Sequence, residues 1–206
     1  SWFQDDPAKD NPAQAVVWFE RVRDLAGQGF IDSLGLAAAS LGWQARAELN
    51  RERYSQALEL YLAQFATGDP TAFASLIQAA NKIFAGGPET LQQVAANPIA
   101  QRVITAYVIA RGGPSLAQPT SASTPLIRVW LDAVEASAVT HVDGAERLAW
   151  AAYQIGEMEI ARRWLDRARP EEAMTLWLRA KLLLHDGRID EAVPLLARVA
   201  RLFPPS

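Results

Sequence analysis

The stretch LRAKLLLHDGRIDEAVPLL, residues 178–196, decides the fold, because it repeats an earlier segment of the same chain. An offset of 31 residues aligns it with RLAWAAYQIGEMEIARRWL, residues 147–165. Five positions then coincide: Ala149 with Ala180, Gly156 with Gly187, Met158 with Ile189, Ala161 with Ala192, and Leu165 with Leu196. A small residue lets one helix approach its partner, and glycine ends that helix before an apolar residue opens the next. The repeat therefore predicts stacked helical hairpins.

A third copy of the repeat lies upstream. Ala45, Tyr54, Ala57 and Tyr61 keep the same internal spacings, although Glu52 stands where the other copies have glycine. One hairpin cannot bury its apolar faces alone, so neighbouring hairpins stack and share their stability. Three or more units are therefore expected.

Proline marks the expected helix starts, often directly after a residue whose side chain caps helices. Between these marks apolar residues recur at spacings of three and four, and no segment sustains a two-residue alternation. We expect an all-α protein, an α-hairpin repeat array of about ten or eleven helices. The expected starts lie near Pro12, Phe30, Arg53, Pro70, Pro88, Pro98, Pro125, Asp143, Glu157, Pro170 and Arg188.

The expected linker is residues 114–124, which combine helix breakers with small polar residues. It separates an N-terminal helical array over residues 12–113, with one degenerate repeat, from C-terminal repeats over 125–206. Residues 1–11 are expected to form an extended tail. A single continuous superhelix is favoured over two domains, because helical arrays tolerate such insertions.

The repeated residues resemble the tetratricopeptide repeat (TPR), whose pattern has a small residue, a turn glycine, an alanine, a large apolar residue and a closing proline. The resemblance is clearest over residues 143–204 and weaker over 38–70. Pro204 closes the last repeat, whereas Pro170 comes three residues early, which accounts for an offset of 31 where the family usually has 34. Pro194 departs from the pattern and should kink the last helix. The resemblance implies a TPR-like superhelix.

The resemblance also implies a concave groove, lined by the first helix of each repeat. Its expected lining is Glu146, Trp150, Tyr153 and Gln154 in one repeat, and Met174, Trp177, Lys181, Leu184 and His185 in the next. Aromatic side chains beside a few polar groups suit an extended peptide or a partner helix. The alternative is that these rings pack against a neighbouring helix. Core packing is expected for Trp18, Trp130 and Trp164.

The family's groove for C-terminal carboxylates uses lysines and asparagines at these positions. This sequence offers only Lys181 there, with Arg46 and Asn50 in the weaker repeat, so that specificity is not predicted.

No catalytic residue, metal ligand set or cofactor is predicted. The chain lacks cysteine, and its two histidines, His141 and His185, fall on different elements without carboxylates at metal-ligand spacing. A formal net charge of −3 does not favour nucleic acid as a partner. Apolar runs broken by charge predict no insertion into a membrane.

The leading hypothesis is a non-catalytic bacterial scaffold for protein–protein interaction, which binds a peptide or a partner helix in the groove. The alternative is a regulatory or accessory domain of a larger protein whose catalytic or membrane-anchored part is absent, because the chain begins at Ser1 without an initiator methionine. Self-association through the C-terminal end is a further hypothesis, since no polar capping helix follows the last repeat. The bacterial cytoplasm and the periplasm both remain open.

Overall fold

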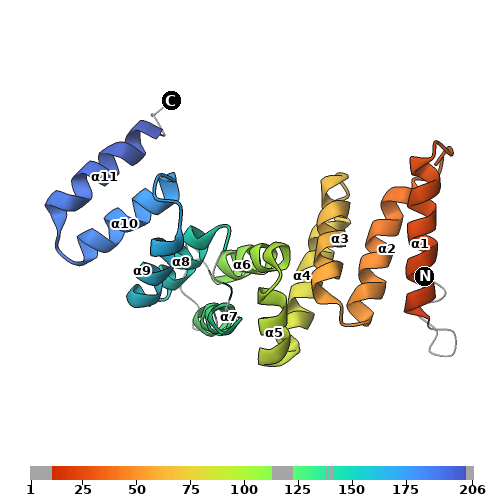
Figure 1. Cartoon of the computed structure of the whole chain (residues 1–206), viewed down its shortest axis with the longest axis horizontal. Coiled ribbons are helices and arrows are strands. Elements are labelled where there is room, and N and C mark those ends of the chain that lie inside the picture. The colour runs from red at the N-terminus through yellow and green to blue at the C-terminus, as the bar shows by residue number, and fades with distance from the viewer. Residues whose placement is uncertain (1–10, 113–122, 138, 140–141, 203–206) are drawn as a thin grey trace. The chain divides into compact units, whose positions relative to one another are not determined.

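The computed structural model describes residues 11–112, 123–137, 139 and 142–202. Within these residues the chain forms eleven α-helices and no strand, and consecutive helices pack in pairs (Figure 1). They are α1 (Pro12–Gly27), α2 (Leu36–Asn50), α3 (Tyr54–Ala66), α4 (Thr71–Ala85), α5 (Gly87–Ala95), α6 (Pro98–Gly112), α7 (Ser123–Ala136), α8 (Ala145–Gln154), α9 (Met158–Arg167), α10 (Ala173–His185) and α11 (Ile189–Leu202). The predicted all-α repeat array is confirmed.

The helix starts follow from local capping. Asn11 accepts a hydrogen bond from the backbone N–H of Gln14 ahead of α1, and Asn97 accepts from the N–H of Ala100 ahead of α6. The largest difference from the sequence expectation is α2, which begins at Leu36 and not near Phe30. Asp32 explains the later start, because its carboxylate accepts the N–H groups of the first turn of α2.

Three hairpins share one turn. The residue before the second helix's N-cap has a positive φ in each: Glu52 (61°), Gly156 (81°) and Gly187 (76°). The next residue donates its N–H to a carbonyl five residues earlier: Arg53 to Glu48 (2.9 Å), Glu157 to Ala152 (3.0 Å) and Arg188 to Leu183 (2.9 Å). This is the closure expected where a left-handed residue ends a helix. The same backbone device therefore joins α2 to α3, α8 to α9 and α10 to α11.

The small residues of the repeat are points of close helix approach. All six are fully buried: Ala45, Ala57, Ala149, Ala161, Ala180 and Ala192. A larger side chain at any of them would push the two helices of its hairpin apart. The repeat recognised in the sequence is therefore a packing requirement of the hairpins.

The helices divide into two compact units, residues 1–103 and 104–206, and the division falls inside α6. The expected linker lies mostly outside the described residues, and α7 already begins at Ser123. Residues 1–10 of the expected tail, with His141 and Pro204, also lie outside the described part. Each unit is considered by itself below.

In unit 1, helices α1 to α5 pack in chain order. A buried polar network joins α1 to α2, because Arg23 donates to the hydroxyl of Ser40 at 2.9 Å and to the side-chain oxygen of Gln44. Gln44 in turn donates to Glu20 at 3.0 Å. Burial lowers the pKa of the Arg23 guanidinium, while the charges of Glu20 and Asp24 raise it. The first helix pair is therefore held by polar contacts as well as by apolar packing.

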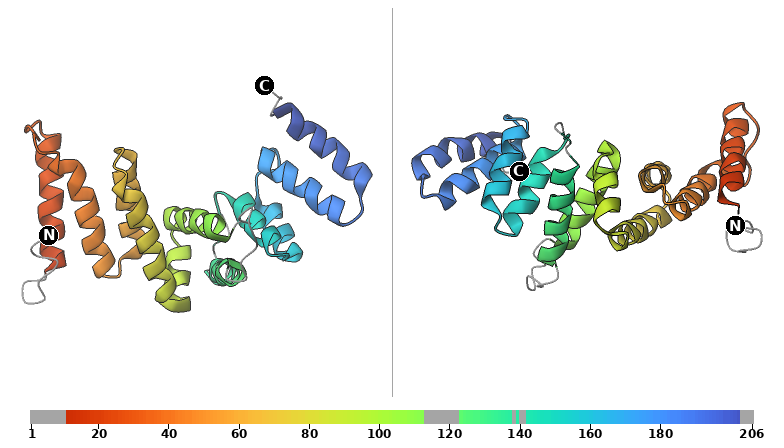
Figure 2. Two further views of the ribbon diagram at one scale, coloured as in Figure 1. Left: turned by 180° about the vertical axis from the view of Figure 1, so that it is seen from behind. Right: turned by 60° about the horizontal axis from the view of Figure 1, so that its bottom comes forward.

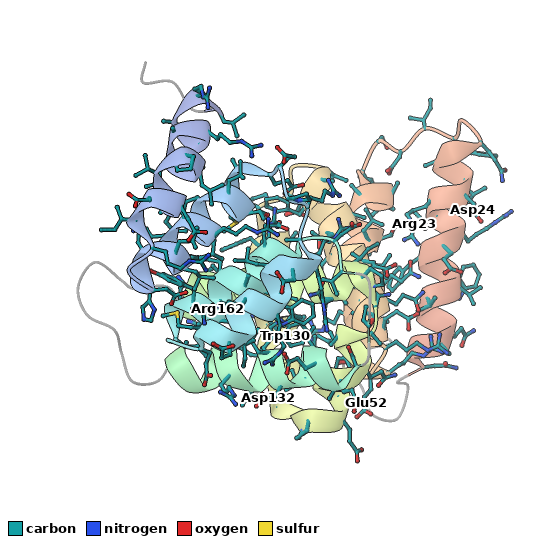
Figure 3. All side chains as sticks on the ribbon, turned by 60° about the vertical axis from the view of Figure 1, so that its left-hand side comes forward. Arg23, Asp24, Glu52, Trp130, Asp132 and Arg162 are labelled. Atoms are coloured by element: carbon teal, nitrogen blue, oxygen red, sulfur yellow. The ribbon has the colours of Figure 1, made fainter. Side chains whose placement is uncertain are left out.

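In unit 2, α8 packs against α7, α9 and α10, and α10 packs against α11 (Figure 2). Trp130 is completely buried and donates its indole N–H to the hydroxyl of Thr105 at 3.0 Å (Figure 3). Trp164 is also buried, so the core packing predicted for both residues is confirmed. The same prediction is wrong for Trp18, which is 59% exposed because it lies on the outer face of α1.

Candidate functional site

Four predicted groove residues form one surface in unit 2, which we call the aromatic patch: Trp150 and Tyr153 of α8 with Trp177 and Lys181 of α10. The ring centroids of Trp150 and Trp177 lie 5.0 Å apart at 58°, and those of Trp150 and Tyr153 lie 5.8 Å apart at 17°. The Lys181 ammonium nitrogen lies 5.6 Å from the centroid of the Trp177 ring. All four side chains are half-buried. The packing of α8 on α10 thus produces a continuous, partly exposed aromatic surface.

Glu146 and Gln154 flank Trp150 on α8, since each is one helical turn away. Glu146 is 8% exposed, and its carboxylate lies 3.9 Å from the guanidinium of Arg147. The side-chain oxygen of Gln154 is buried and has no hydrogen-bond partner among the described residues. A buried carbonyl without a donor costs free energy, so the edge of the patch holds an acceptor able to gain a hydrogen bond.

Met174 and His185 extend the row of Trp177 and Lys181 along α10, because their spacings are three and four residues. His185 lies at the end of the helix, where its Nδ1 is 3.3 Å from the Asp186 carboxylate. Arg162 of α9 donates to the same carboxylate at 2.7 and 2.8 Å. Hydrogen bonds from Arg162 and His185 hold the pKa of Asp186 below its usual value. His185 thus belongs to a contact that ties α9 to α10.

Unit 1 contains a polar cavity that the sequence reasoning did not predict. Its volume is about 580 Å³, and α2, α3 and α4 form its walls. Arg46 and Lys82 supply positive charges to the lining, and Asp69 supplies a negative one. The complete lining is Ala39, Gly42, Trp43, Arg46, Leu49, Asn50, Tyr61, Gln64, Asp69, Thr71, Ser75, Gln78 and Lys82.

Hydrogen bonds fix the wall of this cavity. Gln64 is 5% exposed and donates from its amide nitrogen to Asp69 at 2.7 Å, while its amide oxygen has no partner among the described residues. Gly42 allows this arrangement, because a Cβ on it would lie 2.7 Å from that oxygen. Hydrogen bonds from Thr71 and Gln64 hold the pKa of the Asp69 carboxyl below its usual value. The Asp69 carboxylate is therefore already hydrogen-bonded to side chains of the cavity wall.

A local signal for the cavity exists in the sequence. Gly42 interrupts an otherwise good helical segment, and a glycine inside a helix often marks a close approach. Lys82 also donates to the carbonyl of Leu49 at 3.0 Å, a contact between residues far apart in the chain. That second feature is tertiary, so no pattern within one helix reveals it.

Neither a metal-binding cluster nor a membrane-spanning helix is found among the described residues. No group of three or more histidine, cysteine, aspartate or glutamate side chains is placed to hold a metal ion in that part of the chain. Nor does any helix there combine the length and the hydropathy needed to cross a bilayer.

Comparison of the chain with protein-family models, with curated proteins and with solved structures found no match. The fold nevertheless defines a class, the all-α arrays of helical hairpins, and the aromatic patch and the polar cavity are its candidate binding surfaces.

Proposed function

We propose that the chain is a non-catalytic scaffold for protein–protein interaction, which binds an extended peptide or a partner helix across α8 and α10. The observation that carries this proposal is the contact of Trp150 with Trp177, which joins half-exposed rings from two helices into one surface. Large rigid rings supply contact area at low entropic cost and dominate many interfaces.

We also propose that the hairpins are TPR-like. Three features support this proposal: the shared positive-φ turn, the fully buried alanines at equivalent positions and the packing of α8 on α10 as well as on α9. In such an array the first helices of successive hairpins form one face, so the aromatic patch belongs to the face that binds partners.

The cavity of unit 1 fits the same function with different chemistry. Lys82 favours an acidic side chain of the partner, because the only carboxylate of the lining, Asp69, already accepts hydrogen bonds from Gln64 and Thr71. The proposed partner for this surface is therefore an acidic peptide segment, whereas the aromatic patch favours apolar or aromatic side chains.

Affinity capture from an extract of the source organism tests the proposal. The bait proteins are the wild type, the double variant Trp150→Ala/Trp177→Ala, and the control Trp18→Ala, which removes an exposed indole far from the patch in sequence. Circular dichroism first verifies that all three are folded. We expect mass spectrometry to identify a partner that the wild type and the control retain and the double variant loses. Equal retention by all three proteins would place binding elsewhere.

A further inference from the structure

The last helix, α11, has an apolar face that no helix covers among the described residues. It packs on α10 through the buried Ala192 and the half-buried Leu195, Leu196 and Val199. Beside that contact lies a second stripe of apolar residues, which we call the outer stripe: Ile189, Val193 and Ala200. Ile189 is 59% and Val193 55% exposed, and the spacings of four and seven residues place all three on one side of the helix.

The preceding hairpin shows what a covered second helix looks like. Trp164 and Leu165 of α9 and Ala168, which directly follows it, are buried, and α10 packs against this helix. The residues of α11 at an offset of 31 are Leu195, Leu196 and Val199, and all three stay half-buried. The difference arises because no described helix stands beside α11 as α10 stands beside α9 (Figure 1).

Two charges border the outer stripe at opposite ends of α11. Asp190 lies in the first turn and Arg201 in the last. They are eleven residues apart, close to three full turns, so they lie on the same side of the helix. The other charged residues of α11 form ion pairs, Glu191 with Arg188 and Arg198 with Glu171. Neither Asp190 nor Arg201 has an ion-pair partner among the described residues.

We propose that α11 pairs with α11 of a second copy of this chain in antiparallel orientation. The outer stripes then face each other, and Asp190 lies opposite Arg201 of the partner subunit. Two-fold symmetry repeats this ion pair at the other end, which makes the surface self-complementary. Parallel pairing would instead place like charges side by side. The proposal goes beyond peptide binding and does not depend on it, because the aromatic patch lies on α8 and α10.

Sedimentation of the 206-residue chain over a range of concentrations tests the pairing. One helix from each subunit makes a small interface, so we expect a dimer with a dissociation constant on the order of 10 µM. Val193→Glu should remain monomeric, since it places a charge in the outer stripe. Val129→Glu, at an exposed valine of α7, is the matched control and should dimerise like the wild type. A wild type that stays monomeric, or a Val193→Glu variant that dimerises normally, would overturn the proposal.

Charge reversal tests the antiparallel orientation. Asp190→Arg and Arg201→Asp should each weaken dimerisation at least tenfold, because each brings like charges together twice. The double variant Asp190→Arg/Arg201→Asp should recover most of the affinity, as the swapped pairs are again opposite in sign. Circular dichroism verifies that each variant keeps the helix content of the wild type. Single reversals without effect, or a folded double variant that fails to recover, would exclude the antiparallel pairing.

Discussion

The first helices of two hairpins, α2 in unit 1 and α8 in unit 2, place different chemistry at equivalent positions. An offset of 104 aligns Ala45 with Ala149 and Glu52 with Gly156, which share burial or backbone conformation. The same offset pairs cavity residues with residues of the aromatic patch or residues that flank it: Gly42 with Glu146, Arg46 with Trp150, Leu49 with Tyr153, and Asn50 with Gln154. The hairpin therefore sets where these equivalent positions lie, and the side chains give each surface its own chemistry.

The difference between the two surfaces has a packing cause. In unit 1 a glycine lets Gln64 approach α2, and the side chains around it leave a hollow of about 580 Å³. In unit 2 the equivalent position of α8 holds Trp150, and its ring contacts that of Trp177. The surface of unit 1 is therefore a polar hollow, and that of unit 2 is an aromatic surface.

The largest expected effect is a loss of stability in unit 2, which carries the aromatic surface. Trp130→Ala should destabilise unit 2 by about 3 to 5 kcal/mol, because it empties a fully buried site and leaves Thr105 without its donor. Trp18→Ala, at an exposed indole, should change stability by less than about 0.5 kcal/mol. Urea unfolding followed by circular dichroism measures both, and hydrogen exchange of α8 assigns the transition. Similar losses for the two variants would contradict the observed burial.

The next largest effect is a loss of stability in unit 1 when the polar network between α1 and α2 is removed. Arg23→Ala should cost about 2 kcal/mol, since the buried side chains of Ser40 and Gln44 lose a charged donor. Arg21→Ala, at an exposed arginine of the same helix, is the control and should stay within about 0.5 kcal/mol of the wild type. Urea unfolding with hydrogen exchange of α2 measures the effect. If Arg21→Ala were equally destabilising, the network would not hold α1 to α2.

Substitutions in the turns at Glu52 and Gly156 test whether the two hairpins are equivalent. Glu52→Gly should stabilise unit 1 by about 0.5 to 1 kcal/mol, because Glu52 has a φ of 61° in a region where glycine carries no penalty. Gly156→Ala should destabilise unit 2 by about 1 kcal/mol through the backbone alone, as no atom lies within 4 Å of the added Cβ. Thermal melting measures both changes. Effects of the same sign at the two positions would show that the turns are not equivalent.

The smallest expected effect is a change in how the stability of unit 2 depends on pH. The folded-state pKa of Asp186 is depressed, chiefly by Arg162, so its contribution to stability is present above the unfolded value of 3.8 and is lost as pH falls through the folded pKa. Wild-type unit 2 should therefore lose more stability below about pH 4 than Asp186→Asn, which has no carboxylate to protonate. Urea midpoints measured across this range test the difference. Parallel pH profiles would show that the Arg162 contact does not contribute to stability.

The sequence predicted those parts of the structure that local chemistry determines. Proline, capping residues and turn glycines located the helices, and the repeated alanines located the close contacts. Glu52 was correctly aligned with Gly156 and Gly187 although its side chain breaks the pattern, because the surrounding spacings define the turn. The start of α2 was missed because the Asp32 cap competes with the apolar residues at 30 and 31 for the position of the helix start.

The candidate sites were predictable only in part. The resemblance to the tetratricopeptide repeat implies one groove lined by Trp150, Tyr153, Trp177 and Lys181, and their side chains lie next to one another in unit 2. The cavity of unit 1 depends on the approach of α3 and α4 to α2, which no single segment encodes. The burial of Trp18 was predicted wrongly, because the spacing of apolar residues cannot tell an exposed helix face from a covered one.

The most direct test of the proposed binding surface is site-specific photocrosslinking. Tyr153, within the aromatic patch, and Phe65, an exposed aromatic residue of α3, are each replaced by a photoreactive phenylalanine analogue. Each variant is then irradiated in an extract of the source organism. We expect a protein adduct at position 153 and none at position 65. Adducts at position 65 alone, or a captured partner that never crosslinks at position 153, would contradict binding across α8 and α10.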